Sequence, residues 1–213
     1  MKLIEALEIL RKRPPEGAEK FAVPLLCGFT PLHLQTFLTA ELQLLHCSEF
    51  VKVQTGLYGD LAGSLTRAAE ANADATAVVI EWPDLDSRLG IRSLGGWMPR
   101  LLPEILENAM HRSEAMVKAI QRLANDKPVA VCLPTLPLPP ISYTPGWQEN
   151  PFEAELRARI SAMASRLVQF PDVRLVNSQR LDLLAPLAER FDVKSEVSSG
   201  FPYRMPHASI LAE

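Results

Sequence analysis

The sequence lacks the features that mark several large classes of protein. Only three of its 213 residues are cysteines, and such an odd, scattered set does not suit a disulfide framework. No apolar run approaches the roughly 20 residues of a membrane-spanning helix. Its 22 basic and 25 acidic side chains nearly balance, and no basic stripe indicates a nucleic-acid partner. We therefore expect a cytoplasmic protein with neither a membrane nor a nucleic-acid partner.

Several motifs of common enzyme classes are also missing. The sequence has no GxGxxG after an expected strand, no P-loop, no HExxH or CxxC, and no GxSxG nucleophile elbow. No cluster of histidine and cysteine has the spacing of metal ligands. We therefore expect no cofactor and no metal ion.

Short β-type runs alternate with longer helical patterns along the chain. The expected strands are 21–28, 50–55, 76–82, 128–134 and 173–177, and the expected helices are 31–46, 60–72, about 98–125 and 152–169. This order is typical of an α/β fold, in which a parallel sheet carries helices on both faces. Because 50–55 alternates apolar and polar residues, we expect an edge strand there.

Local signals define the ends of these elements. Thr30, Asp60 and Asn150 are expected helix N-caps. Pro24 interrupts the first run and predicts a bulge, or a strand that begins after it. Residues 1–20 form a separate segment, with a short amphipathic helix ended by Pro14 and Pro15, and we expect one domain over 21–213.

Glycine, histidine and aromatic residues concentrate in the loops that follow the expected strands. Ligands of open α/β sheets bind at these loops, although loops also need such residues as turn formers. One of the loops, within 133–147, carries five prolines and is too long for a simple turn.

Individual residues in these loops allow two interpretations each. Gly28 serves turn geometry or offers backbone N–H groups to an anion. Cys27 is a buried thiol or a thiolate favoured by the next helix. Thr30 is an N-cap or a nucleophile, and His207 packs or acts as a base. Asp84, close to a second carboxylate, belongs to a salt-paired loop or to an acid–base pair.

The succession LLCGFTP, QTGLYGDL, AVVIEWPDLD, LPTLPLPP and SGFPYRMPHASILAE resembles the SGNH/GDSL hydrolase superfamily. More narrowly, it resembles the divergent SGNH-like domain at the N-terminus of FkbH-like proteins of polyketide biosynthesis. The resemblance implies a three-layer α/β/α sandwich with a five-stranded parallel sheet, flavodoxin-like in outline. It also implies hydrolysis of ester-type bonds by a serine, oxyanion-binding glycine and asparagine, and an Asp-x-x-His pair.

Carried onto this sequence, the resemblance is incomplete. The first motif falls on Gly28 to Thr30 and holds no serine, whereas the second places its glycine at Gly59. The third falls on Trp82 to Asp84 without a clear asparagine. The last places its histidine at His207, but Arg204 stands where the aspartate would be.

Two functional hypotheses follow. In the first, the domain hydrolyses an ester or thioester, with His207 as the base and Cys27, Thr30 or water as the nucleophile. In the second, it is a catalytically inactive binding or docking domain of a larger biosynthetic protein, with a neighbouring domain or an acyl carrier as partner. In both, the ligand contacts are expected at Gly28, Phe29, Gly59, Trp82 and Asp84.

Overall fold

The computed structural model describes residues 1–12, 17–93, 98–125, 127–139 and 148–213. Its centre is a five-stranded sheet in which every strand pairing is parallel. The strands are β1 (Lys20–Cys27), β2 (Phe50–Thr55), β3 (Thr76–Val79), β4 (Val129–Cys132) and β5 (Val173–Leu175). Their order across the sheet is β2-β1-β3-β4-β5, the doubly wound order of flavodoxin-like proteins.

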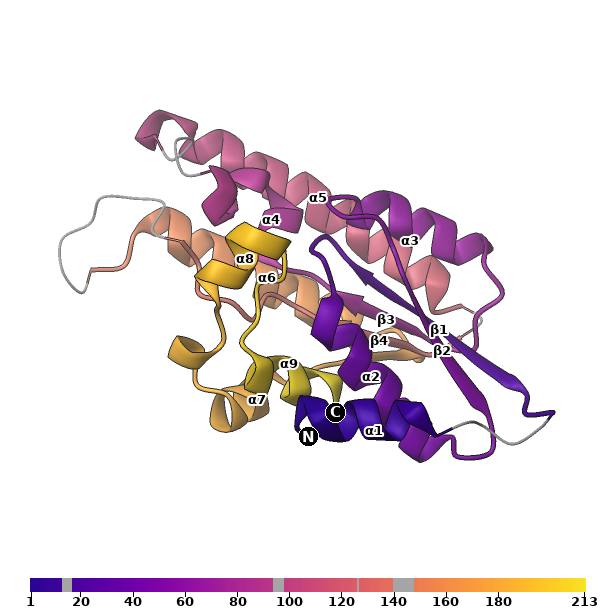
Figure 1. Cartoon of the computed structure of the whole chain (residues 1–213). Coiled ribbons are helices and arrows are strands. Elements are labelled where there is room, and N and C mark those ends of the chain that lie inside the picture. Colours follow the sequence, from indigo (N-terminus) through magenta and orange to yellow (C-terminus); the bar gives the residue numbers. More distant parts are fainter. Residues whose placement is uncertain (13–16, 94–97, 126, 140–147) are drawn as a thin grey trace.

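Helices cover both faces of the sheet and make three layers (Figure 1). One face carries α3 (Leu61–Glu70), α5 (Leu102–Leu123) and α6 (Pro151–Leu167), and the other carries α1 (Leu3–Arg11), α2 (Leu32–Leu45) and α9 (Met205–Ala212). Shorter elements are α4 (Trp82–Leu85), α7 (Ser178–Leu184), α8 (Val193–Ser199) and the 3-10 turns η1 (Ser87–Leu89), η2 (Ile91–Ser93), η3 (Pro99–Leu101) and η4 (Leu187–Glu189). The expected three-layer α/β/α sandwich is confirmed.

Two apolar clusters, one on each face, hold the layers together. Neighbouring side chains of a strand point to opposite faces, so Leu26 and Val78 join the cluster beneath α3 and α5, whereas Cys27 and Val79 join the one beneath α2. This double burial explains why the inner strands appear in the sequence as continuous apolar runs. The alternating strand β2 lies at an edge, as predicted.

Two of the three expected N-caps are present. The Asp60 side chain accepts a hydrogen bond from the Gly63 amide (2.9 Å), and the Asn150 side chain accepts one from the Phe152 amide (2.8 Å). The prediction for Thr30 is wrong, because α2 begins at Leu32, after Pro31, and no side chain caps it.

The expected interruption at Pro24 is also wrong, since β1 runs continuously through it. The Ala22 amide points toward the β3 side and donates to Asp74 (2.7 Å), so alternation directs the Pro24 nitrogen to the same side. Pairing with β3 starts one residue later, at Leu25. The missing donor therefore lies just before this ladder begins, where the strand tolerates a proline.

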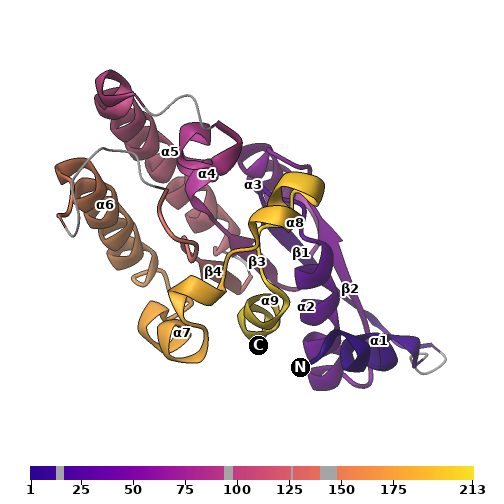
Figure 2. The ribbon, with the colours of Figure 1, turned by 60° about the vertical axis from the view of Figure 1, so that its left-hand side comes forward.

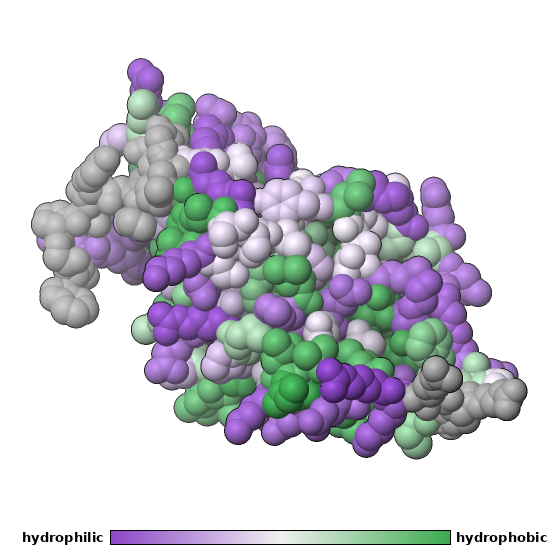
Figure 3. Space-filling view, in the orientation of Figure 1, coloured by the Kyte–Doolittle hydropathy of each residue, from purple (hydrophilic) through white to green (hydrophobic). Residues whose placement is uncertain are grey.

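The N-terminal helix is present as α1 and packs on the layer of α2 and α9. Its Ala6 is fully buried, and the amino group of Met1 donates to the Ser209 hydroxyl (2.6 Å). The prolines expected to end this helix lie outside the described residues. In Figure 3, hydrophobic residues gather low on the visible face, in the region of α1, α7 and α9. In the described ranges, no helix is both long and apolar enough to cross a membrane.

Candidate functional site

A cavity of about 850 Å³ opens at the carboxyl ends of the strands. It lies where the strand order reverses between β1 and β3, the place at which doubly wound sheets bind ligands. The cavity lining includes all five of the residues predicted to contact a ligand: Gly28, Phe29, Gly59, Trp82 and Asp84.

Gly28 and Asp84 lie close together in the cavity wall. One oxygen of Asp84 accepts a hydrogen bond from the Glu81 amide (2.8 Å), and the other would lie 1.8 Å from a Cβ added to Gly28. Because Gly28 does not have a positive φ, the close carboxylate explains the glycine better than turn geometry does.

The environment of Asp84 also changes its acidity. Burial, reinforced by the nearby Glu81 carboxylate, raises the pKa of Asp84 to about 7, against the opposing effects of the Glu81 amide and Arg112. Asp86 differs, because its carboxylate pairs with Arg88 (2.7 Å) and its pKa is lowered. Of these two aspartates, only Asp84 lines the cavity.

Hydrogen bonds join the loops around the cavity. The Gly59 amide donates to the Gly28 carbonyl oxygen (2.8 Å), and its φ of 72° favours glycine. Because the Gly59 amide makes this bond, it is not free to donate to an oxyanion, the role that the resemblance implies for this glycine. The Trp82 indole donates to the Leu136 carbonyl oxygen (2.8 Å), which ties the loop after β3 to the loop after β4.

The segment that contains α8 forms another side of the cavity. This segment lies next to the carboxyl end of the sheet (Figure 2). Arg92, in η2, pairs with Glu196 of α8 (3.3 Å), and its guanidinium lies 5.7 Å from the centre of the Tyr58 ring. The Thr30 amide donates to the Gly200 carbonyl oxygen (3.0 Å), and the Thr30 hydroxyl would lie 2.7 Å from a Cβ added to Gly200. Thr30 therefore anchors the segment that follows α8.

Cys27 lies in the core, where its thiol donates to the Phe29 carbonyl oxygen (3.3 Å). Burial, and then the nearby Asp84 carboxylate, raise the pKa of Cys27 to about 12. A nucleophilic cysteine needs a thiolate, which is scarce at neutral pH in this environment.

Glu81, a buried carboxylate near Asp84 whose role the sequence did not reveal, organises the loops behind the cavity. It accepts hydrogen bonds from the Thr135 amide (3.1 and 3.2 Å) and hydroxyl (2.7 Å), the Leu136 amide (3.2 Å) and the Tyr203 hydroxyl (2.7 Å). Burial raises the pKa of Glu81, and these four donors oppose the shift.

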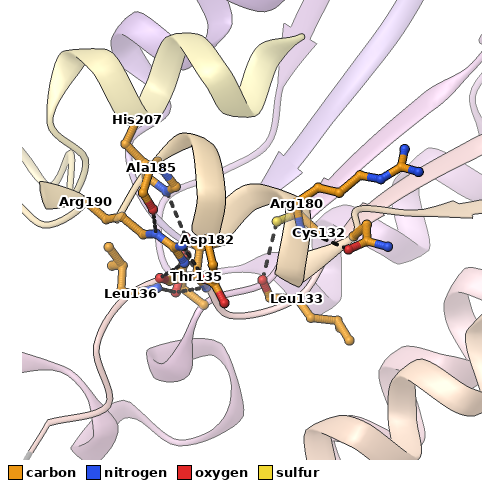
Figure 4. A network of polar contacts seen from close by, with 11 residues as sticks. Cys132, Leu133, Thr135, Leu136, Arg180, Asp182, Ala185, Arg190 and His207 are labelled. Atoms are coloured by element: carbon orange, nitrogen blue, oxygen red, sulfur yellow. Dashed lines mark hydrogen bonds and ion pairs between the residues drawn. The ribbon is translucent and has the colours of Figure 1, made fainter. Parts of the chain in front are cut away.

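His207 lies behind the same network (Figure 4). Its Nε2 is 3.0 Å from the Thr135 hydroxyl oxygen. Because that hydroxyl donates its hydrogen to Glu81, we assign the proton of the bond to Nε2. Nδ1 is buried and has no hydrogen-bond partner among the described residues. Burial, and then Arg190, lower the pKa of His207 to about 4, so the ring is neutral near pH 7.

Arg190 completes the network from the far side. It donates to the carbonyl oxygens of Ala185 (2.8 Å) and Thr135 (3.0 Å) and pairs with Asp182 (Figure 4). Arg204, at the position of the missing aspartate, donates instead to the Phe191 carbonyl oxygen (3.2 Å).

The structure thus separates the two sets of predicted residues. The predicted ligand contacts share the cavity, whereas Cys27, Thr30 and His207 are absent from its described lining. Nothing in the sequence indicated that these three residues lie outside the cavity lining, because their surroundings are formed by segments distant in sequence. Across the described parts of the chain, no three histidine, cysteine, aspartate or glutamate residues are placed to hold a metal ion.

Comparison with solved structures identifies the class of fold. The N-terminal part of BF1531 from Bacteroides fragilis, which contains a phosphatase domain and was solved with Mg, matches with a TM-score of 0.67 and 11% identity, over 100% of this chain and 54% of that one. This chain therefore spans about half of that structure. A Parabacteroides merdae protein described as a GDSL-like lipase matches with a TM-score of 0.51 and 12% identity, over 94% and 95% of the two chains.

These likenesses give the chain an SGNH/GDSL-like fold, in agreement with the resemblance found in the sequence. No protein-family model and no curated protein matches it. At such low identity the likeness concerns the fold, and the site must be interpreted from its own residues.

The burial of the thiols predicts their reactivity. In the native protein at pH 8, we expect the exposed Cys47 to react with a disulfide reagent, while the buried Cys27 and Cys132 react only after unfolding. A Cys47→Ala variant should show no fast-reacting thiol. Fast reaction of a second thiol, lost in Cys27→Ala, would contradict the burial of Cys27.

The Glu81 network predicts a large contribution from one hydroxyl. Thr135→Val removes a donor from Glu81 and the acceptor of His207, and we expect it to lower the free energy of unfolding by about 3 kcal/mol. Thr135→Ser keeps the hydroxyl and should lose about 1 kcal/mol, for the methyl group. Urea unfolding of both variants tests this, and equal losses would contradict it.

Proposed function

We propose that this chain is a ligand-binding domain with the SGNH/GDSL hydrolase fold, which holds an ester or thioester at the carboxyl ends of its strands without serine-triad chemistry. One observation carries the proposal: the predicted ligand contacts share one cavity, and the predicted catalytic side chains lie outside its described lining. Apolar walls with a few polar groups are typical of small-molecule sites.

The state of His207 supports binding without a triad. A general base must present a lone pair to the proton that it removes. Nε2 instead donates to Thr135, and the low pKa of the ring makes it a weak base. Since the first motif also has no serine, we infer that this motif and His207 do not act as a nucleophile–base pair.

A second candidate function is direct hydrolysis, and Asp84 is the observation that favours it. Its carboxyl group lines the cavity, and a base with a pKa near 7 is well matched to neutral solution. Asp84 would take a proton from water as the oxygen attacks the carbonyl carbon. The proton would return to the alcohol or thiol that leaves.

The context of the domain is also part of the proposal. The Bacteroides structure combines a similar fold with a phosphatase domain. The resemblance to FkbH-like proteins suggests the same arrangement. We infer that the bound ester or thioester is presented to a neighbouring domain or arrives on an acyl carrier.

The first experiment measures binding and turnover of p-nitrophenyl esters and acyl thioesters together. We expect saturable binding that weakens at least tenfold in Tyr58→Ala, an exposed residue of the cavity wall, and changes less than twofold in folded His207→Gln. Leu183→Ala, on exposed α7, is the control. Turnover abolished by His207→Gln in folded protein would restore the hypothesis that His207 is the catalytic base and refute ours.

Asp84 predicts a pH dependence of stability. The native pKa of about 7 lies above the usual 3.8, so burying the charged form costs free energy above pH 7, and this cost disappears as pH falls toward 4. Asp84→Asn should therefore be more stable than wild type at pH 8, by roughly 2–4 kcal/mol, and lose the advantage at pH 4.5.

Urea unfolding at the two pH values measures this difference, in which the titration of His207 cancels. If hydrolysis occurs, its rate should rise through pH 7 in wild type and be absent in Asp84→Asn. A constant stability difference between the two proteins would show that Asp84 does not titrate in this range.

A further inference from the structure

The cavity is longer than a small ester requires. From the strand ends it continues between α3 and α5, where the lining side chains are small or apolar: Ala62, Leu65, Ala115, Met116 and Ala119. Its volume of about 850 Å³ approaches the upper end for small-molecule sites. A ligand that fills it has an extended part beyond the group at the strand ends.

The α5 side of this groove carries three cations, Arg112, Lys118 and Arg122. Arg112 donates to the Asp84 carbonyl oxygen (3.3 Å). The side chains of Lys118 and Arg122 have no hydrogen-bond or ion-pair partner within the described ranges. Ten residues of helix separate Arg112 from Arg122, which is about 15 Å along the axis.

The acidic side chains of the lining do not pair with Lys118 or Arg122. Asp60 pairs with Arg67, and Glu196 pairs with Arg92. Glu81 is enclosed by its four donors, and Asp84 lies at the strand ends, beside Gly28. The far part of the groove therefore keeps an excess of positive charge.

We propose that the groove between α3 and α5 binds the phosphorylated arm of an acyl thioester, with the thioester beside Gly28 and Asp84 and a phosphate between Lys118 and Arg122. This rests on the proposed function and names its ligand class. The two cations suit a phosphate, and the small side chains between them and Asp84 leave room for a narrow, flexible arm. Coenzyme A thioesters and carrier-bound phosphopantetheine share this chemistry.

Calorimetry with three acetyl thioesters tests the proposal: S-acetylpantetheine, which has no phosphate, S-acetyl-4′-phosphopantetheine and acetyl-coenzyme A. We expect the two phosphorylated ligands to bind at least tenfold more tightly than the first at low salt, and the advantage to shrink at high salt. Equal affinity for the two phosphorylated ligands would place recognition at the 4′-phosphate that they share. Tight binding of acetyl-coenzyme A alone would assign the site to the nucleotide phosphates of the free coenzyme.

Charge reversal locates the phosphate. The double variant Lys118→Glu, Arg122→Glu should lose the tenfold advantage and bind S-acetylpantetheine as wild type does. Lys52→Glu, at an exposed position of the edge strand β2 and outside the cavity lining, is the control for reversal of a positive charge elsewhere on the surface and should change nothing. Both substituted positions of the double variant are exposed, so the fold should be retained.

The outcomes separate the two proposals. If S-acetylpantetheine binds and neither phosphate nor charge reversal matters, the inference is wrong and the proposed function stands. If simple esters and all three thioesters fail to bind, both are wrong. An equal loss in the double variant and in Lys52→Glu would show a general charge effect and overturn the assignment to the groove.

Discussion

The buried carboxylate of Glu81 is the interaction on which the site depends. Glu81 lies two residues after β3, directly before α4, and its donors come from the loop after β4 and from the segment that leads into α9. A carboxyl group removed from water is tolerated when hydrogen bonds satisfy its oxygens, so these segments must meet at one point. The Trp82–Leu136 bond and the Arg190–Thr135 bond then hold the same loops from either side.

The same network also uses His207, the residue expected to act as the catalytic base. His207 lies in the first turn of α9, at the position where the resemblance places the histidine of the last motif, but its Nε2 contacts Thr135 in the network around Glu81. The histidine is thereby held neutral and internal, with Arg204 directed elsewhere. A hydrolase-like architecture is compatible with such a change, because function depends on the site rather than on the fold.

The sequence was most informative where a residue's role follows from its local pattern. The inner strands were predicted because burial on both faces requires continuous apolar runs, and five residues of the cavity lining because they follow strand ends. The role of Glu81 could not be predicted from the sequence, because its hydrogen-bond partners Thr135 and Tyr203 lie 54 and 122 residues away along the chain. Thr30 failed as a cap for a similar reason: Gly200, distant in sequence, determines its surroundings.

The position of Gly28 shows how the site could exchange one chemistry for another. A side chain there would occupy the space of the Asp84 carboxyl group, so the turn after β1 offers backbone where related folds would offer a nucleophile. The wall carries instead the carboxyl group of Asp84, whose pKa is raised to about 7 by burial. With Lys118 and Arg122 at the other end, the cavity is polarised along its length, and an elongated ligand with one anionic end can enter it in only one favourable direction.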